Sequence, residues 1–412
     1  MKRRVVITGM GAISPIGNTA TEMCNNALAG VVGIEKIVGF DTADQKVTLA
    51  GEVKNYEPTD YFDRMSARRM ARFTQFALIA AREAVAQSGI DMSVEDPNRF
   101  GVNVSSGIGG LPTIEAEHEK GMKRGFDKVS PLFVPMAISN MAAGTLAIEF
   151  GFKGSASCIV TACASGTNAI GEAFRQIRDG YADGFLTGGA ESTVSPLGIG
   201  GFTSMKALHE GDDPARASIP FDKDRSGFVM GEGSGVLMLE EYEHAVKRGA
   251  KILGEIVGYG VSCDAHHMTA PLEDGSGAAQ CMKNAMKDAG IEPYQVGYIN
   301  AHGTSTPMND RGETAAVKLA FGEHAENLLM SSTKSMTGHL LGASGAVEAI
   351  ITVNALAEGM APPTMGYVNP DPDCDLNIVP NKAVSMDAEY AMSNSLGFGG
   401  HNATLVFRKV AE

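Results

Sequence analysis

Basic side chains are scarce in this chain of 412 residues. Lys and Arg number 34 against 48 Asp and Glu, so the formal net charge is −14. General nucleic-acid binders present a basic surface, and this deficit disfavours that class of function. Hydrophobic residues make up 44% and charged residues 20% of the chain, near the averages of globular proteins. The chain therefore has enough apolar side chains for a large core, and its composition argues against intrinsic disorder.

Cysteine is also infrequent. The six cysteines include no CxxC pair, which argues against a disulfide scaffold and predicts a reducing, cytoplasmic setting. The start MKRRVVITG superficially resembles a signal peptide, but Gly9, Gly11 and Pro15 interrupt its apolar run and no A-x-A site follows. We expect a buried first strand there instead.

Familiar cofactor and metal motifs are missing. A dinucleotide fingerprint would need a third glycine where Ser14 stands, and no GxxxxGK[ST] phosphate loop occurs. His266 and His267 are adjacent, without the HExxH spacing of a metal site.

One uncharged stretch, residues 129–148, has about the length of a membrane span. Pro131, Pro135 and Asn140 make it too broken and too polar for that role. We expect a buried loop and helix here, with an exposed apolar face that pairs with a second copy of the chain.

Apolar β-branched runs alternate with segments of helical periodicity along the whole chain. The predicted strands are 4–9, 99–106, 155–162, 183–190, 251–262, 295–301, 328–333, 375–379, 389–395 and 402–408. The predicted helices are 67–88, 164–179, 275–290, 309–321 and 344–358. Continuous apolar strands are buried on both faces, so we predict a layered α/β fold made of two similar halves.

A strand-like run leads directly into Cys163 and then into a helix, in SCIVTACASGTNAIGEAF. The free N–H groups and the positive dipole at a helix start stabilise a thiolate, which predicts a lowered pKa and a nucleophilic thiol. The alternative is that Cys163 is a small buried hydrophobic residue, since free cysteine is among the most buried residue types.

Two histidines lie beside glycine near the ends of predicted strands, His302 in NAHGTST and His339 in STKSMTGHLLG. A single histidine is more often structural than catalytic. However, Lys334 and Glu348 stand nearby in otherwise apolar sequence, and together with a thiol they predict one shared polar pocket. For Glu348 the alternative is a single exposed position of a helix.

Glycines surround Phe398 in NSLGFGGHNATLVF. They allow main-chain N–H groups to approach a developing oxyanion, and a mobile phenylalanine can gate access. A tight hairpin with a core aromatic is the alternative.

Basic residues are clustered despite the acidic total. Four arginines fall within nine residues without an acid among them, at 64, 68, 69 and 72, and Lys123, Arg124 and Lys128 form a second cluster. Such clusters are either a solvated helix face or an electrostatic docking surface for an acidic partner.

Four blocks, in this order, resemble the β-ketoacyl-[acyl-carrier-protein] synthases, which are thiolase-like condensing enzymes. They are TACASG around Cys163, NAHGTSTPMND around His302, SSTKSMTGHLLGASGAVE around His339, and NSLGFGG near the end. The resemblance covers essentially the whole chain, and the block at 220–235 is similar to that of the synthase II branch. Synthase I and polyketide ketosynthases share the same chemistry and stay open as alternatives.

The resemblance implies a five-layered αβαβα fold that acts as a homodimer. Its N-terminal half, 1–250, would carry the nucleophilic cysteine and its C-terminal half, 251–412, the two histidines. Cys163 would take an acyl group from acyl carrier protein, and malonyl carrier protein would lose CO₂ beside His302 and His339. The enolate would then attack the acyl thioester in a Claisen condensation, giving a 3-oxoacyl carrier protein two carbons longer.

Further roles are implied by the same resemblance. The N–H groups of Cys163 and Phe398 would form an oxyanion hole, Lys334 and Glu348 would organise the histidines, and Asp310 and Asp264 would support a gating loop. The implied acyl-pocket residues are Ile108, Phe133 and Phe202, with Phe133 reaching the partner subunit's pocket. The implied carrier-docking residues are Arg64, Arg68, Arg69, Arg72 and Lys206. No cofactor is implied apart from a structural monovalent cation at Asn300, Glu348, Ser393 and Asn394.

Two positions depart from the family pattern. Leu396 stands where the motif usually reads NSFGFGG, which bears on the gate and the chain-length range, and His401 follows the glycines where some relatives carry Thr.

Two rival functions are a non-catalytic chain-length factor, which typically lacks the nucleophile, and a cysteine hydrolase, which uses one histidine with an orienting amide. Cys163 with two histidines and a lysine favours condensation over both.

Overall fold

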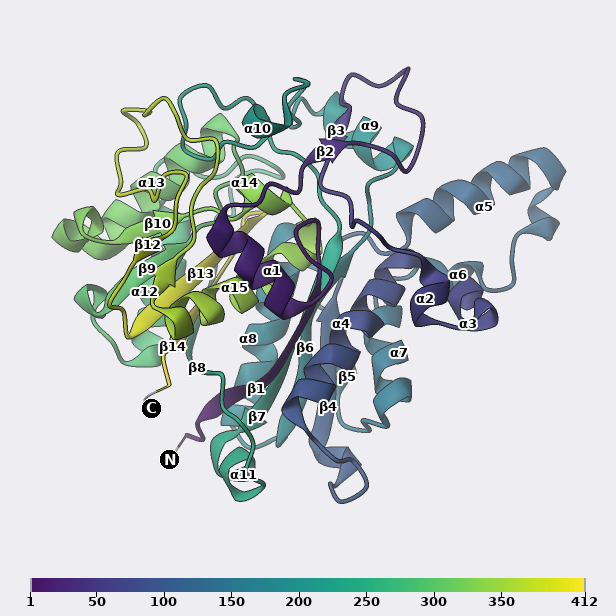
Figure 1. Cartoon of the computed structure of the whole chain (residues 1–412), viewed down its shortest axis with the longest axis horizontal. Coiled ribbons are helices and arrows are strands. Elements are labelled where there is room, and N and C mark those ends of the chain that lie inside the picture. Colours follow the sequence, from purple (N-terminus) through teal and green to yellow (C-terminus); the bar gives the residue numbers. More distant parts are fainter. Residues whose placement is uncertain (1, 411–412) are drawn as a thin grey trace.

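The computed structural model describes residues 2–410, and in this range ten strands form one sheet in the order β10-β9-β13-β14-β8-β1-β7-β6-β4-β5 (Figure 1). The strands of the first half are β1 (Val5–Ile13), β4 (Phe100–Ser105), β5 (Ala156–Ser157), β6 (Gly184–Glu191) and β7 (Gly233–Glu241). Those of the second half are β8 (Gly254–Cys263), β9 (Val296–Asn300), β10 (Leu329–Ser331), β13 (Tyr390–Gly397) and β14 (His401–Arg408). Two small ribbons pair β2 (Glu35–Lys36) with β3 (Leu49–Ala50), and β11 (Met360–Ala361) with β12 (Val384–Ser385).

The two groups of five strands repeat the same topology. From the outer edge inward, each half places its third, second, fourth, fifth and first strand in turn. The halves meet where β1 pairs antiparallel with β8, from Val5 opposite Ile256 to Ile7 opposite Gly254. The predicted layered α/β fold with two related halves is confirmed, while the exact boundary at residue 250 stays a prediction.

Helices cover both outer faces and fill the space between the halves. The longer helices are α1 (Ala20–Ala29), α4 (Arg72–Ser88), α5 (Leu111–Arg124), α7 (Met141–Phe150), α8 (Ser165–Arg178), α9 (Pro196–Ser204), α12 (Ser276–Ala289), α13 (Pro307–Phe321) and α15 (Ser344–Glu358). The shorter ones are α2 (Pro58–Tyr61), α3 (Arg64–Arg69), α6 (Phe133–Ala137), α10 (Pro214–Ala217), α11 (Tyr242–Lys247) and α14 (Lys334–Thr337).

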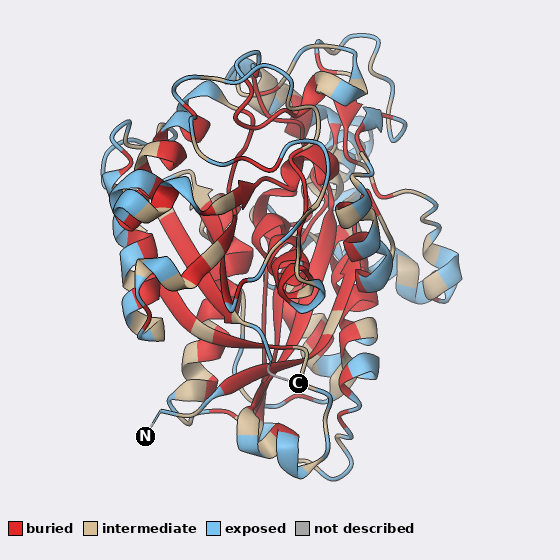
Figure 2. Cartoon of the chain, turned by 60° about the vertical axis from the view of Figure 1, so that its left-hand side comes forward, coloured by how far each residue is buried: buried red, intermediate tan, exposed pale blue. Residues whose placement is uncertain are grey.

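The central layer consists of α8 and α15. Helix α8 packs on β6 and β4 of the first half, whereas α15 contacts β13 of the second half and β7 of the first. Helices α4 and α7 cover the outer face of the first half, and α12 and α13 that of the second. A helix between the two halves of the sheet has no solvent face, and α15 is accordingly buried almost all round, as Figure 2 shows for the centre of the molecule.

Small residues allow the close approach of α4 to β1. A Cβ atom added at Gly9 would lie 2.0 Å from the carbonyl oxygen of Ala84, and one added at Gly11 would lie 1.9 Å from that of Ala80. The helix backbone therefore rests directly on the strand. The predicted first strand is confirmed, and it is buried along most of its length.

The structure corrects several predicted elements. Helix 67–88 is two helices, because the backbone is extended at Met70 and Ala71 between α3 and α4. The strand at 375–379 is wrong, since only Ile378 forms an isolated bridge, and the strand at 155–162 shrinks to two residues. Strand β7 was not predicted, because its glycine-rich start hides the apolar run VLML that follows.

The stretch 129–148 is less buried than the sequence predicts, while the predicted exposed apolar face is confirmed. Helix α5 projects from the body with α6 beside it, and Leu132, Val134 and Ile138 are exposed (Figure 1). Among residues 2–410 no helix is both long and apolar enough to cross a membrane. All six cysteines are free thiols.

We expect Gly11→Ala to destabilise the fold by about 1–3 kcal/mol, because its methyl group overpacks the contact between β1 and α4. Gly201→Ala is the matched control, since this exposed position inside α9 has open space around its Cα atom. The control should be neutral or stabilise by up to about 1 kcal/mol. Urea unfolding of both variants measures the difference, and equal free energies of unfolding would contradict the packing argument.

Candidate active site

Cys163 lies in a short 3₁₀ turn, Ala162–Ala164, that runs directly into α8. The residue before it, Ala162, has a φ of 50°, which is an unusual left-handed conformation for a residue with a side chain. This turn places the sulfur at the wall of a cavity although the side chain is 8% exposed. The predicted position at a helix start is confirmed.

The predicted net lowering of the thiol pKa is wrong, although the N–H groups at the helix start act in the predicted direction. Burial raises the pKa of Cys163 to about 12. The positive charge of Lys334 and the backbone N–H groups of Phe398 and Cys163 act in the opposite direction but do not outweigh the loss of hydration. The free thiol therefore keeps its proton at neutral pH, and its activation requires a nearby base.

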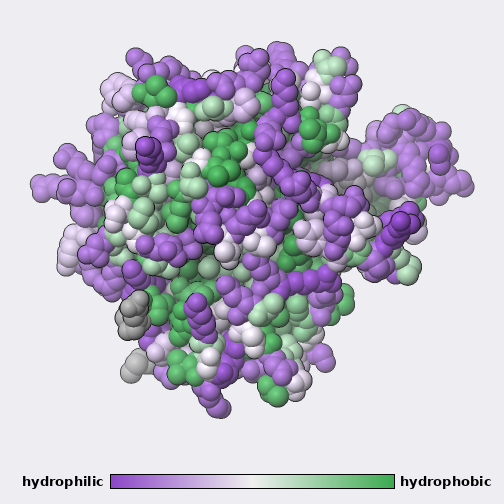
Figure 3. Space-filling model, viewed as in Figure 1, coloured by the Kyte–Doolittle hydropathy of each residue, from purple (hydrophilic) through white to green (hydrophobic). Residues whose placement is uncertain are grey.

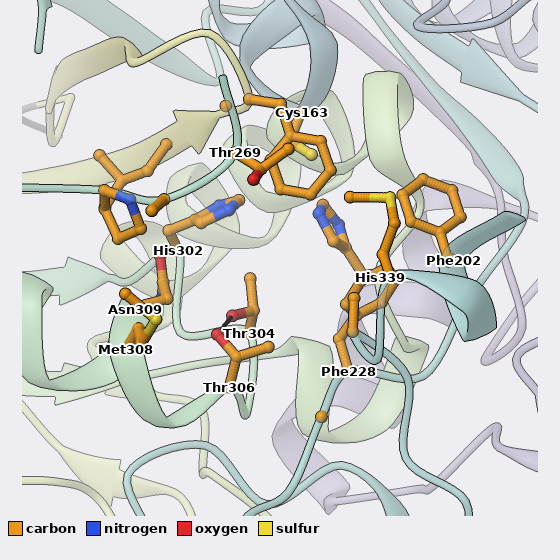
Figure 4. Close-up of a pocket in the computed structure, with 18 of the residues that line it drawn as sticks. Cys163, Phe202, Phe228, Thr269, His302, Thr304, Thr306, Met308, Asn309 and His339 are labelled. Atoms are coloured by element: carbon orange, nitrogen blue, oxygen red, sulfur yellow. Dashed lines mark hydrogen bonds between the residues drawn. The ribbon is translucent and has the colours of Figure 1, made fainter. Parts of the chain in front are cut away.

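His302 and His339 supply two such groups. His302 follows β9 and His339 follows α14, and their rings stand almost perpendicular with centroids 5.3 Å apart. One ligand atom from each histidine and the sulfur of Cys163 all lie within 4.8 Å of one another. Figure 4 shows the two rings pointing toward each other below the cysteine.

Both imidazoles are held in the neutral form. Burial is the main cause that lowers the pKa of His302 and His339 well below the ordinary value, and the charge of Lys334 acts in the same direction. The Nδ1 atom of His339 accepts a hydrogen bond from the Leu341 N–H and lies 2.8 Å from the Ser344 hydroxyl. This network assigns the proton of His339 to Nε2, which makes that atom a hydrogen-bond donor.

A buried ion pair lies behind the histidines. The ammonium of Lys334 donates to Glu348 Oε1 at 2.5 Å, and both side chains are almost completely buried. Burial raises the pKa of Glu348 to about 7, against the opposing effect of Lys334. The pair joins α14 to the central helix α15, so the charge that acts on the thiol and the imidazoles has a fixed position.

Phe398 occupies the tight turn between β13 and β14. Gly399 and Gly400 have φ values of 89° and 74°, which explains the glycines around this turn. The Phe398 ring lies 6.3 Å from that of Phe202, and together with Cys163 and both histidines they line a cavity of ≈ 450 Å³. Leu396 also lines this cavity, whereas His401 begins β14 beside the turn.

The two predicted gating aspartates lie in different places. Asp264 lines the cavity, and its carboxylate accepts hydrogen bonds from Asn402 Nδ2 at 2.7 Å and from the Leu272 N–H at 3.2 Å. Asp310 is completely buried, accepts a hydrogen bond from the Phe221 N–H, and lies 3.3 Å from Arg225 Nε. It anchors the block 220–227 rather than lining the cavity.

Only one predicted acyl-pocket residue lines this cavity. Phe202 belongs to it, but Phe133 lies on α6 beside the projecting helix α5, and Ile108 is exposed.

The predicted docking arginines divide into two sets. Arg64, Arg68 and Arg69 are exposed on α3. Arg72 begins the separate helix α4, donates to Glu232 at 2.6 Å, and lies over the rings of Tyr56 and Phe76. Arg72 is therefore not on the same helical face as Arg64 and Arg68, because the chain is extended between the two helices. Lys206 lines the cavity.

The predicted cation residues lie on β9, β13 and the central helix α15. Asn300 and Ser393 are register partners in adjacent strands, and within residues 2–410 the buried oxygens Ser393 Oγ and Glu348 Oε2 have no hydrogen-bond partner. Asn394 is engaged by Glu313 and Thr404. Two free oxygens beside an amide are a donor set that fits a hard cation.

Two buried acids near the cavity were not predicted. Glu313 accepts hydrogen bonds from the N–H groups of His302 and Gly303 at 2.8 and 2.7 Å, and so holds the turn that carries His302. Glu191 accepts hydrogen bonds from the turn after β4 and from Gly342. Neither acid lies in one of the blocks singled out from the sequence, and Glu313 stands among polar residues that gave no sign of its burial.

Comparison with known proteins gives a consistent result. The profile of the β-ketoacyl synthase N-terminal domain matches residues 2–245, and that of the C-terminal domain matches residues 253–368. The 3-oxoacyl-[acyl-carrier-protein] synthase 2 of Staphylococcus aureus strain COL is 53% identical over 407 residues, covering 99% of this chain and 98% of its own. The protein of the same name from Synechocystis sp. is 51% identical over 409 residues, with 99% and 98% covered.

Solved structures agree with the sequence relatives. A β-ketoacyl synthase from Burkholderia phymatum STM815 superposes with a TM-score of 0.92 at 34% identity, covering 100% of both chains. A ketosynthase in complex with its type II polyketide acyl carrier protein superposes with a TM-score of 0.92 at 36% identity, again over 100% of both chains.

Lys334→Met should raise the pKa of His302, His339 and Cys163, since the positive charge that opposes imidazolium and favours thiolate is removed. NMR titration of the histidines should move to higher pH, and alkylation of Cys163 at neutral pH should slow. Stability should fall by about 3–5 kcal/mol, because Glu348 is left buried without its partner. Lys318→Met, which removes an exposed lysine paired with Asp375, is the control. Histidine titrations equal to those of the control would refute the coupling.

Proposed function

The chain belongs to the β-ketoacyl synthase family and is a condensing acyltransferase, and on this premise we propose how its site lengthens acyl chains on acyl carrier protein in fatty acid synthesis. The substrates are acyl and malonyl carrier proteins, and the products are 3-oxoacyl carrier protein, CO₂ and free carrier. The observation that carries the proposal is the cluster of Cys163, His302 and His339 within 4.8 Å, beside the buried Lys334–Glu348 pair.

In the first step, the sulfur of Cys163 attacks the thioester carbonyl of the acyl carrier. The new bond joins the sulfur to the acyl carbon, and the bond from that carbon to the carrier sulfur breaks. Because the thiol is protonated at rest, a neutral imidazole accepts its proton and passes it to the departing carrier thiolate. The N–H groups of Cys163 and Phe398 face the sulfur and stabilise the intermediate oxyanion.

In the second step, malonyl carrier protein loses CO₂ and the electrons of the broken carbon–carbon bond form an enolate. The Nε2–H of His339 and a ring N–H of His302 donate hydrogen bonds to the enolate oxygen. Neutral imidazoles suit this role, because they donate without requiring a counter-ion in a buried site. The enolate carbon then attacks the acyl carbon on Cys163, the carbon–sulfur bond breaks, and the released thiolate takes up one proton from solvent.

The carrier docks on the exposed arginines of α3 and on Lys206. Arg64, Arg68 and Arg69 form a basic surface on a chain whose net charge is −14. An acidic carrier would be attracted to this surface although the whole chain repels it. Lys123 and Arg124 end the projecting helix α5, whose outer side is largely hydrophilic in Figure 3. Arg72 supports this surface through Glu232 instead of contacting the carrier.

The functional unit is a homodimer in this proposal. Two features support it: β5 leaves an unpaired sheet edge among the described strands, and α6 with its neighbours exposes Leu132, Val134 and Ile138. A second copy on this face would bring a Phe133 side chain toward the open space beside Ile108. The acyl pocket is then completed by both subunits.

A monovalent cation between Asn300, Ser393 and Glu348 is a structural element of the proposal. It would satisfy the two unpartnered oxygens described above and take no part in the reaction. The six free thiols support a reducing, cytoplasmic setting.

Mixing the protein with acyl carrier protein should add an acyl mass that malonyl carrier protein discharges. Cys163→Ala should abolish this mass, whereas Cys158→Ala, a partly exposed thiol in the preceding loop, should retain it. Intact-mass spectrometry measures both. The Cys163→Ala variant should still decarboxylate malonyl carrier protein, and adding His302→Ala or His339→Ala should slow that step about 10²–10³-fold. Decarboxylation indifferent to both histidines would contradict their assigned role.

Arg68→Glu with Arg69→Glu should raise the KM for carrier substrates roughly tenfold at low ionic strength and by less in salt, since the screening length falls from about 30 Å at 0.01 M to about 8 Å at 0.15 M. The control is Lys247→Glu on α11, which is exposed and lies outside the basic surface. Steady-state kinetics at several salt concentrations measures the effect. A KM that does not depend on salt, or equal effects in both variants, would argue against docking at α3.

A further inference from the structure

Glu191 is a fully buried acid that the reaction steps do not use. It ends β6, and its carboxylate accepts hydrogen bonds from three different backbone N–H groups: Gly107 at 2.7 Å, Gly342 at 3.1 Å and Ile108 at 3.3 Å. The hydroxyl of Ser106 lies 2.9 Å from the same carboxylate. Glu191 thus connects the turn after β4 in one half to the turn before α15 in the other.

The internal repeat gives this contact a counterpart at the nucleophile. In the first half a residue with positive φ, Ala162, is followed by Cys163 and the sequence ASG at the start of α8. In the second half Leu341, with a φ of 47°, is followed by Gly342 and the same ASG at the start of α15. Gly342 therefore occupies the place of the catalytic cysteine in the second half.

The two turns also meet equivalent parts of the opposite half. The fourth strand of the second half, β13, ends at Gly397, where an added Cβ would lie 3.3 Å from the Cys163 nitrogen, and Phe398 follows. The fourth strand of the first half, β6, ends at Glu191, which binds the Gly342 nitrogen. At one turn the N–H groups are available to a substrate oxyanion, whereas at the other a carboxylate of the chain occupies them.

We propose that Glu191 is a positioning residue whose carboxylate fills the second, non-catalytic anion site of the duplicated fold and thereby holds the acyl-pocket turn and the His339 turn in one fixed arrangement. Four donors face one carboxylate, so that each of its two oxygens accepts two hydrogen bonds, as an anion can. The backbones of Gly107 and Gly342 also meet here, since a Cβ on Gly342 would lie 2.3 Å from the Gly107 nitrogen.

This arrangement links Glu191 to both substrates. Ile108, whose N–H it binds, is one of the three predicted acyl-pocket residues. Gly342 is adjacent to Leu341, whose N–H fixes the Nδ1 atom of His339. Displacing the shared turn would therefore disturb the acyl pocket and the donor for the enolate together. The kinetic part of this inference rests on the proposed function, but the anion site itself does not.

The test is chemical rescue of Glu191→Ala. This change removes four non-hydrogen atoms, the number in acetate, and leaves a small polar cavity lined by N–H donors. We expect condensation to fall roughly tenfold or more, because small displacements of positioning groups are costly. Millimolar sodium acetate should raise the melting temperature and restore much of the activity, whereas acetamide and sodium chloride should do neither.

Glu83→Ala is the matched control. Glu83 also accepts backbone hydrogen bonds, from Ala12 and Ala20, but it lies outside the cavity and contacts neither turn. It should lose stability while its acyl chain-length profile and its activity remain those of the unsubstituted protein. Rescue of Glu191→Ala by acetamide as well as acetate, or no rescue in melting temperature, would overturn the anion site.

Glu191→Gln tests the proposal if Glu191→Ala does not fold. The amide keeps the shape but turns an NH₂ group toward N–H donors, so the chain-length profile and the decarboxylation rate should both change. Because the carboxylate also disfavours the nearby thiolate, alkylation of Cys163 at neutral pH should become faster. A variant with unchanged profile, decarboxylation and alkylation would overturn the proposal. If the unsubstituted protein takes up no acyl mass, the proposed function fails, while the acetate-dependent melting of Glu191→Ala still tests the anion site.

Discussion

The buried ion pair between Lys334 and Glu348 is the constraint on which the site depends. Placing two charges in the core is costly, and the 2.5 Å hydrogen bond offsets that cost only while both partners remain in place. Because the pair is fixed, the core holds the positive charge of Lys334 close to the thiol and both imidazoles. That charge adds to the effect of burial in keeping the imidazoles neutral, and it favours the thiolate, so it acts on three reacting groups at once. A solvated lysine would do neither, because water would screen it.

Much of the fold was predictable, because strands buried on both faces and helices with one apolar face leave clear periodic patterns. The errors occur where tertiary contacts override these patterns. The break at Met70 and Ala71 separates α3 from α4, and no proline or glycine in the sequence indicates it. Strand β7 begins in glycine-rich sequence whose small residues are needed for close packing against the central helix. The segment 375–379 alternates polar and apolar residues as a strand does, yet its pairing is limited to one isolated bridge, from Ile378 to Met330.

The site was predictable to the extent that its residues are chemically distinctive. A cysteine at a helix start and two histidines beside glycines can be recognised from sequence, and the structure brings them together. The pKa of the thiol was predicted in the wrong direction, because a helix start was visible in the sequence and the burial of the sulfur was not. Glu313 and Glu191 were missed for a related reason: their partners are backbone N–H groups of distant turns, and no side-chain pattern records such contacts.

The duplicated fold explains why this site is built from unequal halves. Two equivalent turns, each with positive φ before a helix, bring two sets of N–H groups to the centre of the molecule. Buried N–H groups without acceptors are costly, so a second set needs a partner whenever substrate occupies only the first. Gly342 stands at the position equivalent to Cys163, and without a side chain it leaves room for the Glu191 carboxylate. Glu191 thus supplies the acceptor from within the chain. The turn at Cys163 is thus open to substrate, whereas the equivalent turn at Gly342 is closed by a carboxylate of the chain.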